Sequence, residues 1–361
     1  MMNEQQRRVV DHPGGPLLVL ACPGSGKTRC ITERIIRLLD EDVSPTNILA
    51  VTFTNKAAKE MAERIKERGY GHKLTISTFH SFCVKVLRKC SKLIGYKSNF
   101  SICDSNSQKS LFHKIVKEKG LDPKDWKYAP QYLISMLEGK KNQLLTDEEF
   151  YDGLKPEYVE IFNQYQDTLK ISNSMDFGDL IYNVVRIFEA QPRVRDAYAI
   201  RFEHLLVDEM QDTNKAQLEL VKHLASSHNN VIAVGDSCQA IYGWRGACID
   251  NILSFEKHFK NAQTAYLGIN YRSTPEILKV AENLIKQNKG NLKVNLEAVR
   301  GSNNSPPTYK EFKAPENEAE GVAEIILNEK WKGHDYKDMA ILCRTNALTR
   351  SFEECFRRKE I

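Results

Sequence analysis

Short apolar runs alternate with segments of helical periodicity in the N-terminal part of the chain. The apolar runs at residues 17–21, 48–53 and 74–78 each precede a segment with helical spacing, such as TRCITERIIRLL or NKAAKEMAERI. Two further apolar runs of the same kind lie at residues 204–209 and 231–236. Buried strands that alternate with helices predict an α/β fold built on a doubly wound parallel sheet.

The pattern changes between residues 90 and 190, where helical segments follow one another with few β-rich runs. We therefore expect a helical insertion that makes the first sheet domain discontinuous in sequence. The predicted parts are a first α/β domain at 1–89 and 190–266, a helical insertion at 90–189, and the beginning of a second α/β domain at 267–361.

A further α/β segment begins near Leu267. Its pattern predicts helices at 275–288, at 317–329 and over the last residues of the chain, with a strand at 338–344.

The composition is that of a globular protein, with 41% hydrophobic and 27% charged residues among 361. A net charge of +5 is only mildly basic, so it does not by itself indicate a nucleic-acid partner. The nine cysteines include no Cys-x-x-Cys pair, and no His-x-x-x-His pair is present. We therefore expect reduced thiols and neither a disulfide framework nor a zinc site.

No apolar run approaches the ~20 residues that a membrane helix needs. The first residues, MMNEQQRRVVDH, lack the apolar centre of a secretory signal. The expectation is an intracellular protein with no membrane partner, in the cytoplasm or nucleoid of a bacterium or the nucleus of a eukaryote.

The segment ACPGSGKT, residues 21–28, follows a predicted strand and opens a predicted helix, which is the context of a P-loop. Backbone N–H groups would wrap a phosphate, Lys27 would reach the β- and γ-phosphates, and the Thr28 hydroxyl would bind Mg²⁺. The alternative is a plain glycine turn between a strand and a helix. The residues expected to bind nucleotide here are Ala21, Cys22, Pro23, Gly24, Ser25, Gly26, Lys27, Thr28 and Arg29.

The segment LLVDEMQD places Asp208 and Glu209 at the carboxyl end of an apolar strand, where α/β proteins build their sites. Asp208 suits a Mg²⁺ ligand, and Glu209 suits positioning or deprotonating an attacking water. The alternative is an acidic helix cap. Beside a P-loop, the pair favours hydrolysis of ATP or GTP.

The loop GDSCQAIYGWRGA, residues 235–247, combines two kinds of side chain. Tyr242, Trp244 and Arg245 suit stacking on flat partners, whereas Asp236 and Gln239 suit a phosphate or metal site.

Together these motifs resemble the UvrD/Rep/PcrA group of superfamily 1 DNA helicases. The resemblance implies two RecA-like domains with ATP in the cleft between them and 3′→5′ translocation on single-stranded DNA. RecB-like and AddA-like nuclease-helicases share several motifs, but the match continues through the helical insertion and favours the first group. The matching segments, in order, are NEQQRRVV, ACPGSGKT, AVTFTNKAAKEM, ISTFHSFCVKVLR, MDFGDLI, VDEMQDTNKAQ, VGDSCQAIYGWRGA, INYRSTPEIL and AILCRTNALTRSFEE.

The resemblance implies roles at the nucleotide. Gln6 would contact the adenine edge, Tyr271 would stack on the adenine, and Arg272 would be an arginine finger. The alternatives are a solvated helix residue for Gln6 and a surface ion pair for Arg272. Gln211 and Gln239 would sense the γ-phosphate. The implied catalytic residues are Lys27, Glu209, Gln239 and Arg272, with ATP and Mg²⁺ as cofactors and Thr28 and Asp208 as metal ligands.

On the DNA side, Phe53, Tyr242 and Trp244 match aromatic positions that stack on bases, although Phe53 could instead belong to the core. The partners implied are single-stranded DNA and single-strand/duplex junctions. The other implied DNA or coupling contacts are Thr54, Asn55, Ser77, Thr78, His80 and Arg245. A basic stretch is either a solvated helix face or a further backbone contact: Lys85, Arg88, Lys89, Lys92 and Lys97.

The sequence departs from the family pattern in a few places. Ser237 and Cys238 replace acidic residues, Gly268 replaces a common Glu, and residues 289–305 lack a Trp-containing segment. The chain stops at Ile361, where family members enter a fourth subdomain. We expect a fragment, a split protein or an incomplete product whose remaining part is supplied in cis or in trans.

The leading hypothesis is an ATP-dependent DNA helicase used in DNA repair, replication or recombination, with repair or replication proteins as further partners. One alternative is a nucleotide- and DNA-binding module that does not unwind alone. Another is a P-loop ATPase acting on protein, which the aromatic set disfavours.

Overall fold

The structure, a computed structural model, describes residues 2–70, 73–288 and 294–361. It consists of two compact units, Met1–Asn303 and Asn304–Ile361. None of the helices in the described residues combines the length and the apolar character needed to cross a membrane.

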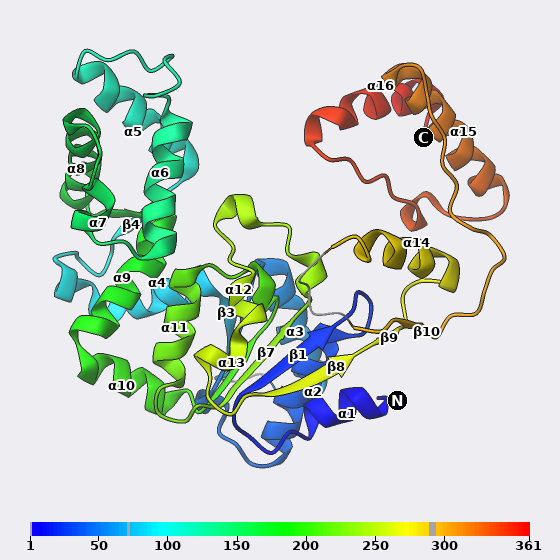
Figure 1. Ribbon diagram of the computed structural model, residues 1–361, viewed down its shortest axis with the longest axis horizontal. Coiled ribbons are helices and arrows are strands. Elements are labelled where there is room, and N and C mark those ends of the chain that lie inside the picture. Colours follow the sequence, from blue (N-terminus) through cyan, green and yellow to red (C-terminus); the bar gives the residue numbers. More distant parts are fainter. Residues whose placement is uncertain (1, 71–72, 289–293) are drawn as a thin grey trace. The chain divides into compact units, whose positions relative to one another are not determined.

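A parallel sheet in the order β3-β2-β6-β7-β1-β8 forms the centre of the first unit (Figure 1). The predicted α/β fold is therefore confirmed, and the five strands predicted for this sheet all form within two residues of their expected ends. β8 had not been predicted. The strands are β1 (Leu17–Ala21), β2 (Ile48–Thr52), β3 (Thr75–Thr78), β6 (His204–Val207), β7 (Val231–Gly235) and β8 (Gln263–Leu267).

The strands β1, β2 and β7 are buried along their whole length, because helices cover both faces of the sheet there. On β1, Leu18 and Leu20 join one core, whereas Leu17 and Val19 join the other. The helices of the first core are α4 (Phe79–Cys90), α9 (Phe177–Ala190), α11 (Lys215–Ala225), α12 (Asp250–Leu253) and α13 (Phe255–His258), with α10 (Pro192–Arg201) packed beside them. Those of the second are α1 (Glu4–Val10), α2 (Lys27–Asp40) and α3 (Asn55–Glu67).

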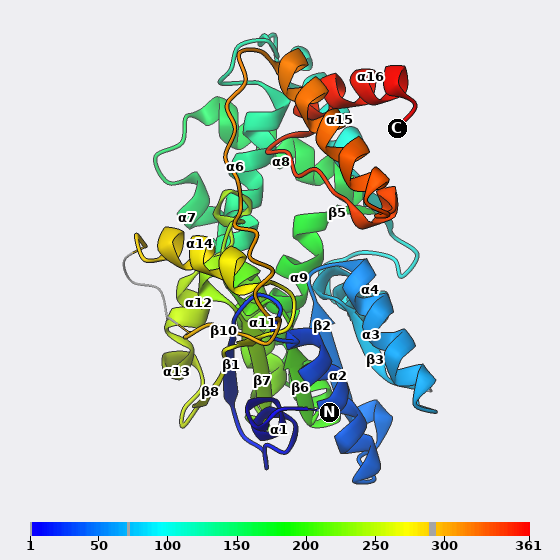
Figure 2. The same cartoon turned by 90° about the vertical axis from the view of Figure 1, so that its right-hand side faces the viewer.

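The helical insertion has an apolar core of its own. Phe112, Leu133, Phe162 and Tyr165 are fully buried there, and the rings of Phe112 and Tyr165 stack with centroids 4.2 Å apart. A short parallel pair, β4 (Ser101–Cys103) with β5 (Ser174–Asp176), had not been predicted. The helices are α5 (Ser105–Glu118), α6 (Pro130–Gln143), α7 (Asp147–Tyr151) and α8 (Pro156–Ile171), which form the group around α6 in Figures 1 and 2.

Helix α9 lies inside the range expected for the insertion, but its apolar face packs on the sheet. Leu180, Val184 and Phe188 are all fully buried in the same core as Leu18. The first unit also continues past β8 through β9 (Ile269–Asn270), α14 (Pro275–Ile285) and β10 (Glu297–Ala298). The expected domain boundaries stay predictions.

The second unit contains α15 (Pro315–Trp331) and α16 (Thr349–Lys359), which pack through Ala319, Ala323, Phe352 and Cys355. The helices predicted here form, but the strand predicted at 338–344 does not. Within the described residues of 304–361 no other strand is available, so this apolar run has no backbone partner. Leu342 is accordingly 96% exposed.

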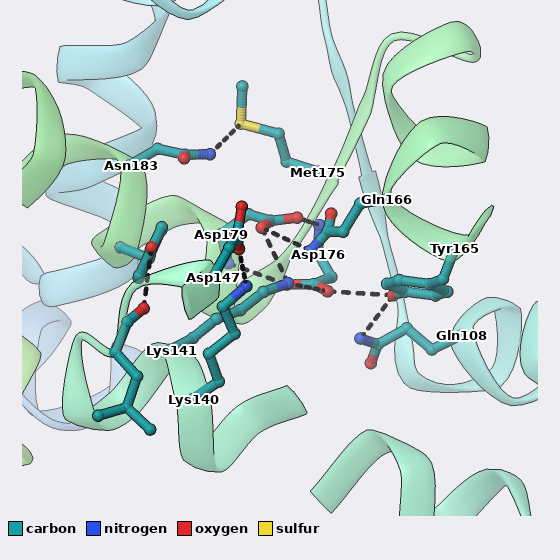
Figure 3. A network of polar contacts seen from close by, with 12 residues as sticks. Gln108, Lys140, Lys141, Asp147, Tyr165, Gln166, Met175, Asp176, Asp179 and Asn183 are labelled. Atoms are coloured by element: carbon teal, nitrogen blue, oxygen red, sulfur yellow. Dashed lines mark hydrogen bonds and ion pairs between the residues drawn. The ribbon is translucent and has the colours of Figure 1, made fainter. Parts of the chain in front are cut away.

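A buried ionic network joins α6 to the start of α9 (Figure 3). The Lys141 ammonium lies 2.6 Å from a carboxylate oxygen of Asp176 and 2.8 Å from one of Asp179. The Tyr165 hydroxyl donates to Asp176, and Gln108 donates to that hydroxyl. Burial opposes ionisation of Asp176, but Lys141 holds its pKa below the usual range. Burial and the Asp176 charge raise the pKa of Asp179 to about 6.

We predict that Lys141→Met lowers the free energy of unfolding by about 3–5 kcal/mol, because two carboxylates are left buried without a cation. Denaturant titration of the wild-type and variant proteins measures the change. Lys114→Met on α5 is the control, because that ammonium is exposed and pairs with Glu118 at the surface. Equal stabilities of the Lys141 and Lys114 variants would contradict the prediction.

Candidate nucleotide and nucleic-acid site

The candidate residues follow the carboxyl ends of neighbouring strands. The P-loop follows β1, Phe53 follows β2, Asp208 follows β6 and Asp236 follows β7. Because these strands are parallel, their carboxyl ends meet along one edge of the sheet. Segments far apart in sequence therefore contribute to one site.

The P-loop is held in shape by its own backbone and by helix α1. Gly24 and Gly26 have φ values of +72° and +86°, a left-handed conformation that favours glycine. The Ser25 hydroxyl donates to the Cys22 carbonyl at 2.8 Å, and the Gln6 amide donates to the Ser25 carbonyl at 2.9 Å.

Gln6 is only 2% exposed, so the alternative of a solvated helix residue is wrong. Its Oε1 accepts from the Asn3 backbone N–H while its Nε2 supports the P-loop. The Asn3 side chain donates to the Tyr271 hydroxyl at 2.7 Å, which places Tyr271 beside the same helix. The adenine contacts of Gln6 and Tyr271 stay predictions.

The Lys27 ammonium lies 3.0 Å from Glu209 Oε2. Glu209 has a φ of +53°, a strained conformation for a residue with a side chain and one that is frequent at functional sites. Burial, followed by the Glu209 charge, raises the pKa of Asp208 to about 7, against the effects of Lys27 and of a hydrogen bond from Thr28.

Glu209 stands at the N-cap of the short 3-10 turn Met210–Asp212, but its side chain makes no capping hydrogen bond there, so capping does not account for the acidic pair. Asn214 is the N-cap of α11, and its side chain accepts from the Gln217 backbone N–H. Asp208 accepts instead from the Glu209 N–H at 3.1 Å. The Glu209 carboxylate accepts hydrogen bonds from the Lys27 ammonium and the Gln211 amide.

Arg272 lines an open cavity of about 390 Å³ together with Lys27, Thr28, Glu209 and Gln239. The structure therefore brings together four of the residues expected to act on the phosphates and one expected metal ligand. Arg272 makes no ion pair with any residue that the structure describes, so the surface ion-pair alternative is not realised.

Two glutamines link the acidic residues to the loop after β7. The buried Gln211 amide donates to Glu209 Oε2 at 2.8 Å, and its oxygen accepts from the Asp236 N–H at 2.9 Å. The Gln239 amide in turn donates to Asp236 Oδ2 at 2.6 Å. A side chain at Gly235 would come within 2.6 Å of Gln211, so glycine is required beside this link. Sensing of a γ-phosphate by both glutamines stays a prediction.

The candidate DNA-stacking residues gather into one aromatic cluster. The rings of Phe53 and Tyr242 stack 5.4 Å apart, and Trp244 lies 6.4 Å from Tyr242. The Arg245 guanidinium lies 4.7 Å from the Trp244 ring. Trp244 is 73% exposed, and Phe53 lies outside the buried cores. The alternative that Phe53 is a core residue is therefore wrong.

Two of the threonines expected to contact DNA cap helices. Thr54 accepts from the Ala57 N–H at the start of α3, and Thr78 accepts from the Ser81 N–H at the start of α4. Ser77, next to Thr78, is buried. These roles account for the hydroxyl groups of both threonines without DNA, so DNA contacts by these residues stay predictions.

The other residues expected to contact DNA differ from one another in their surroundings. The His80 ring packs edge-on against Phe177, and burial lowers its pKa. Asn55 is exposed in the first turn of α3. In the basic stretch, the Arg88 guanidinium covers the ring of Phe100 at 3.9 Å, which is a structural role for that residue.

The model of the UvrD/REP helicase N-terminal domain matches residues 2–260, and that of the UvrD-like helicase C-terminal domain matches residues 265–361. The chain belongs to the UvrD/REP helicase family.

Curated relatives of this UvrD/REP-family chain include two named ATP-dependent DNA helicase PcrA. The Staphylococcus aureus protein is 44% identical over 98% of this chain and 49% of its own length. The Staphylococcus epidermidis protein is 43% identical over 100% of this chain and 50% of its own. This chain thus spans about half the length of the curated relatives it matches.

Among solved structures, the Pif1 helicase from Candida albicans aligns with a TM-score of 0.34 and 11% identity, over 74% of this chain and 40% of that one. This likeness is too low to bear on the fold. The expectation that the chain stops before a fourth subdomain stays a prediction.

Sequence reasoning missed Asn270, which is 1% exposed. Its amide donates to the Pro23 carbonyl at 2.5 Å, and its oxygen accepts from the N–H groups of Arg272 and Ser273 at 2.9 and 2.7 Å. One side chain thus joins the P-loop to the segment that carries Arg272. The sequence signal that could have indicated a role for Asn270 is its position in the INYRS motif, directly before Tyr271 and Arg272.

The departure at Gly268 has a local cause. A Cβ there would lie 2.3 Å from the Asn295 carbonyl oxygen, and the Gly268 N–H donates to the Gln5 side chain at 2.9 Å. Only glycine fits this approach of two backbones. Of the departure at 289–305, residues 289–293 lie outside the described residues.

We predict that Asn270→Ala lowers the free energy of unfolding by about 1–3 kcal/mol and weakens nucleotide binding, because it leaves buried backbone groups unpaired. Denaturant titration and titration with a fluorescent ATP analogue measure the two effects. The matched control is Asn283→Ala, which removes an exposed amide from α14. An Asn270 variant that matched this control in both measurements would refute the assignment.

Proposed function

We propose that this chain carries the ATP-hydrolysing and DNA-binding machinery of an ATP-dependent DNA helicase that translocates 3′→5′ on single-stranded DNA. The observation that carries the proposal is the polar link through Gln211, Asp236 and Gln239. It runs from Glu209 to the loop of the aromatic cluster. A phosphate-handling site and a stacking surface thus share one edge of the sheet.

The residues present fit ATP and Mg²⁺. The two left-handed glycines leave the P-loop backbone open to a phosphate group, and Lys27 provides a cation beside it. The Thr28 hydroxyl and the Asp208 carboxylate are the oxygen ligands that Mg²⁺ prefers. When bound, Mg²⁺ would supply positive charge to the phosphate oxygens.

Four side chains would have separate roles in hydrolysis of the nucleotide. Lys27 exchanges Glu209 for phosphate oxygens when nucleotide enters, which releases the Glu209 carboxylate to orient a water. Arg272 neutralises negative charge that develops on the transferred phosphoryl group. Gln239, bound to Asp236, reports the state of the phosphate to the loop.

Stacking on the aromatic cluster suits DNA of any sequence, because every base has a π-face. The exposed Trp244 and the Arg245 guanidinium beside it provide such a surface together with Phe53 and Tyr242. The names of the PcrA relatives support a DNA substrate. The 3′→5′ direction, and a role in DNA repair, replication or recombination, are supported by the resemblance of the motifs.

We predict that the complete natural chain, with ATP, separates a duplex that carries a 3′ single-stranded tail. Lys27→Ala is expected to lower both ATP hydrolysis and strand separation by about a hundredfold or more, because a transition-state cation is lost. Steady-state ATPase and fluorescent strand-separation assays measure the two rates.

Lys66→Ala, which removes an exposed lysine from α3, is the control and should retain both activities. Separation that required a 5′ tail would overturn the proposed direction. Hydrolysis unaffected by single-stranded DNA would overturn the helicase proposal as a whole. Hydrolysis without strand separation would favour a binding module that does not unwind alone.

We predict that Trp244→Ala weakens binding of single-stranded DNA by about 1–3 kcal/mol with little dependence on base sequence, because one stacking face is lost. Fluorescence anisotropy of labelled oligonucleotides measures the effect. Trp331→Ala is the matched control, since Trp331 is 88% exposed on α15 outside the aromatic cluster. Equal losses for the two variants would show that the cluster is not the stacking surface.

A further inference from the structure

Asn142, near the end of α6, connects the helical insertion to two segments of the sheet unit. Its amide nitrogen lies 3.3 Å from the Arg245 carbonyl oxygen, to which it donates. Its oxygen accepts from the Asn214 side chain at 2.8 Å. Gly246 packs on the same side chain, because an added Cβ would lie 2.8 Å from the Asn142 nitrogen. The Asn142 amide therefore contacts both the N-cap residue of α11 and the backbone at Arg245 and Gly246.

The Asn214 end of the bridge leads to the phosphate site. Asn214 caps α11 and follows the short turn that begins after Glu209. The Asn251 amide holds this turn by donating to the Thr213 and Asn214 carbonyls at 3.0 and 3.1 Å. Glu209 and Asn214 are thereby joined by a short and well-bonded piece of backbone.

The Arg245 end of the bridge leads to the aromatic cluster. The Arg245 guanidinium lies 4.7 Å from the Trp244 ring and 5.3 Å from the Tyr242 ring. Trp244 itself is largely exposed, and the bond from Asn142 to the Arg245 backbone restrains this loop. The Cys248 N–H, which donates to the Thr213 carbonyl, and the stack of Tyr242 on Phe53 hold the loop as well.

The helix that carries Asn142 is itself fixed. Lys141, the preceding residue, is buried between the carboxylates of Asp176 and Asp179 in the network of Figure 3. Asp176 is also held by the Tyr165 hydroxyl. A fixed Asn142 can therefore act as a common support for the Asn214 segment and the Arg245 loop.

We propose that Asn142 is a positioning residue through which the helical insertion couples occupation of the phosphate site to the DNA-stacking loop. The amide suits this task because it donates to one segment and accepts from the other at once. Asn142 contacts neither the nucleotide cavity nor the aromatic rings, so it acts through Asn214 and Arg245. The inference rests on the proposed function and names a further part of its machinery.

The decisive variant is Asn142→Asp, which keeps an acceptor for Asn214 but replaces the donor to the Arg245 carbonyl by a repelling oxygen. Asn142→Ala removes both bonds and serves if the aspartate variant folds poorly. Gln143→Glu is the matched control, because it makes the same chemical change at an exposed neighbouring position on α6.

The measurement is the dissociation constant of labelled oligo(dT), with and without Mg²⁺ and the non-hydrolysable analogue AMP-PNP, in the complete natural chain. In the wild-type and Gln143→Glu proteins we expect the nucleotide to change this constant by about five- to 150-fold, the usual range for coupled sites. In Asn142→Asp, which leaves the link through Gln211, Asp236 and Gln239 in place, we expect a change at least about threefold smaller than in the wild type. The variant is expected to remain folded and to bind the oligonucleotide without nucleotide.

The possible outcomes distinguish a failure of the Asn142 inference from a failure of the proposed function. A wild-type protein in which nucleotide and DNA do not affect each other contradicts the proposed function. A coupled wild type with an equally coupled Asn142→Asp variant overturns the inference alone. Loss of basal ATPase and thermal stability in proportion to the loss of coupling in both Asn142 variants assigns a merely structural role, and also overturns it.

Discussion

The parallel pairing of the strands is the constraint on which the site depends. In a parallel sheet every carboxyl end lies at the same edge, so the residues that follow the strands become neighbours. Lys27 and Glu209 are 182 positions apart in sequence, yet their side chains meet at 3.0 Å. They meet because β1 and β6 both pair with β7 in the same direction. The helical insertion can interrupt the chain between them without disturbing this arrangement.

Buried amides then fix the loops that the sheet brings together. Gln6, Gln211 and Asn270 are each no more than 2% exposed, and each bonds through both its nitrogen and its oxygen. An amide donates and accepts at once, which neither a carboxylate nor an ammonium can do. The loops of the site are consequently held by buried hydrogen bonds, although the cavity that they line is open to solvent.

The sequence was sufficient for those features whose cause is local. Apolar runs and glycine-rich turns near each motif predicted the P-loop and five strands of the sheet. They also predicted that Asp208 and Glu209 lie at the carboxyl end of a strand. Asn270 and Asn142 were not predictable in this way, because a single polar residue shows its partners only after distant segments meet. The strands β4 and β5 have three residues each, too few for a clear period. β8 has five residues, but its sequence QTAYL is not an apolar run. The apolar run at 338–344 had the pattern of a strand, but pairing is a property of two segments, and no described segment of its unit pairs with it.

Under the proposed function, the stack between Phe53 and Tyr242 would have an energetic consequence for movement along DNA. These two rings already cover one another, so a base that inserts between them replaces an existing contact rather than filling an empty place. The net gain for each base is the difference between two similar stacking free energies. Such an exchange is nearly balanced, and near balance is what allows a base to be released as readily as it is taken up.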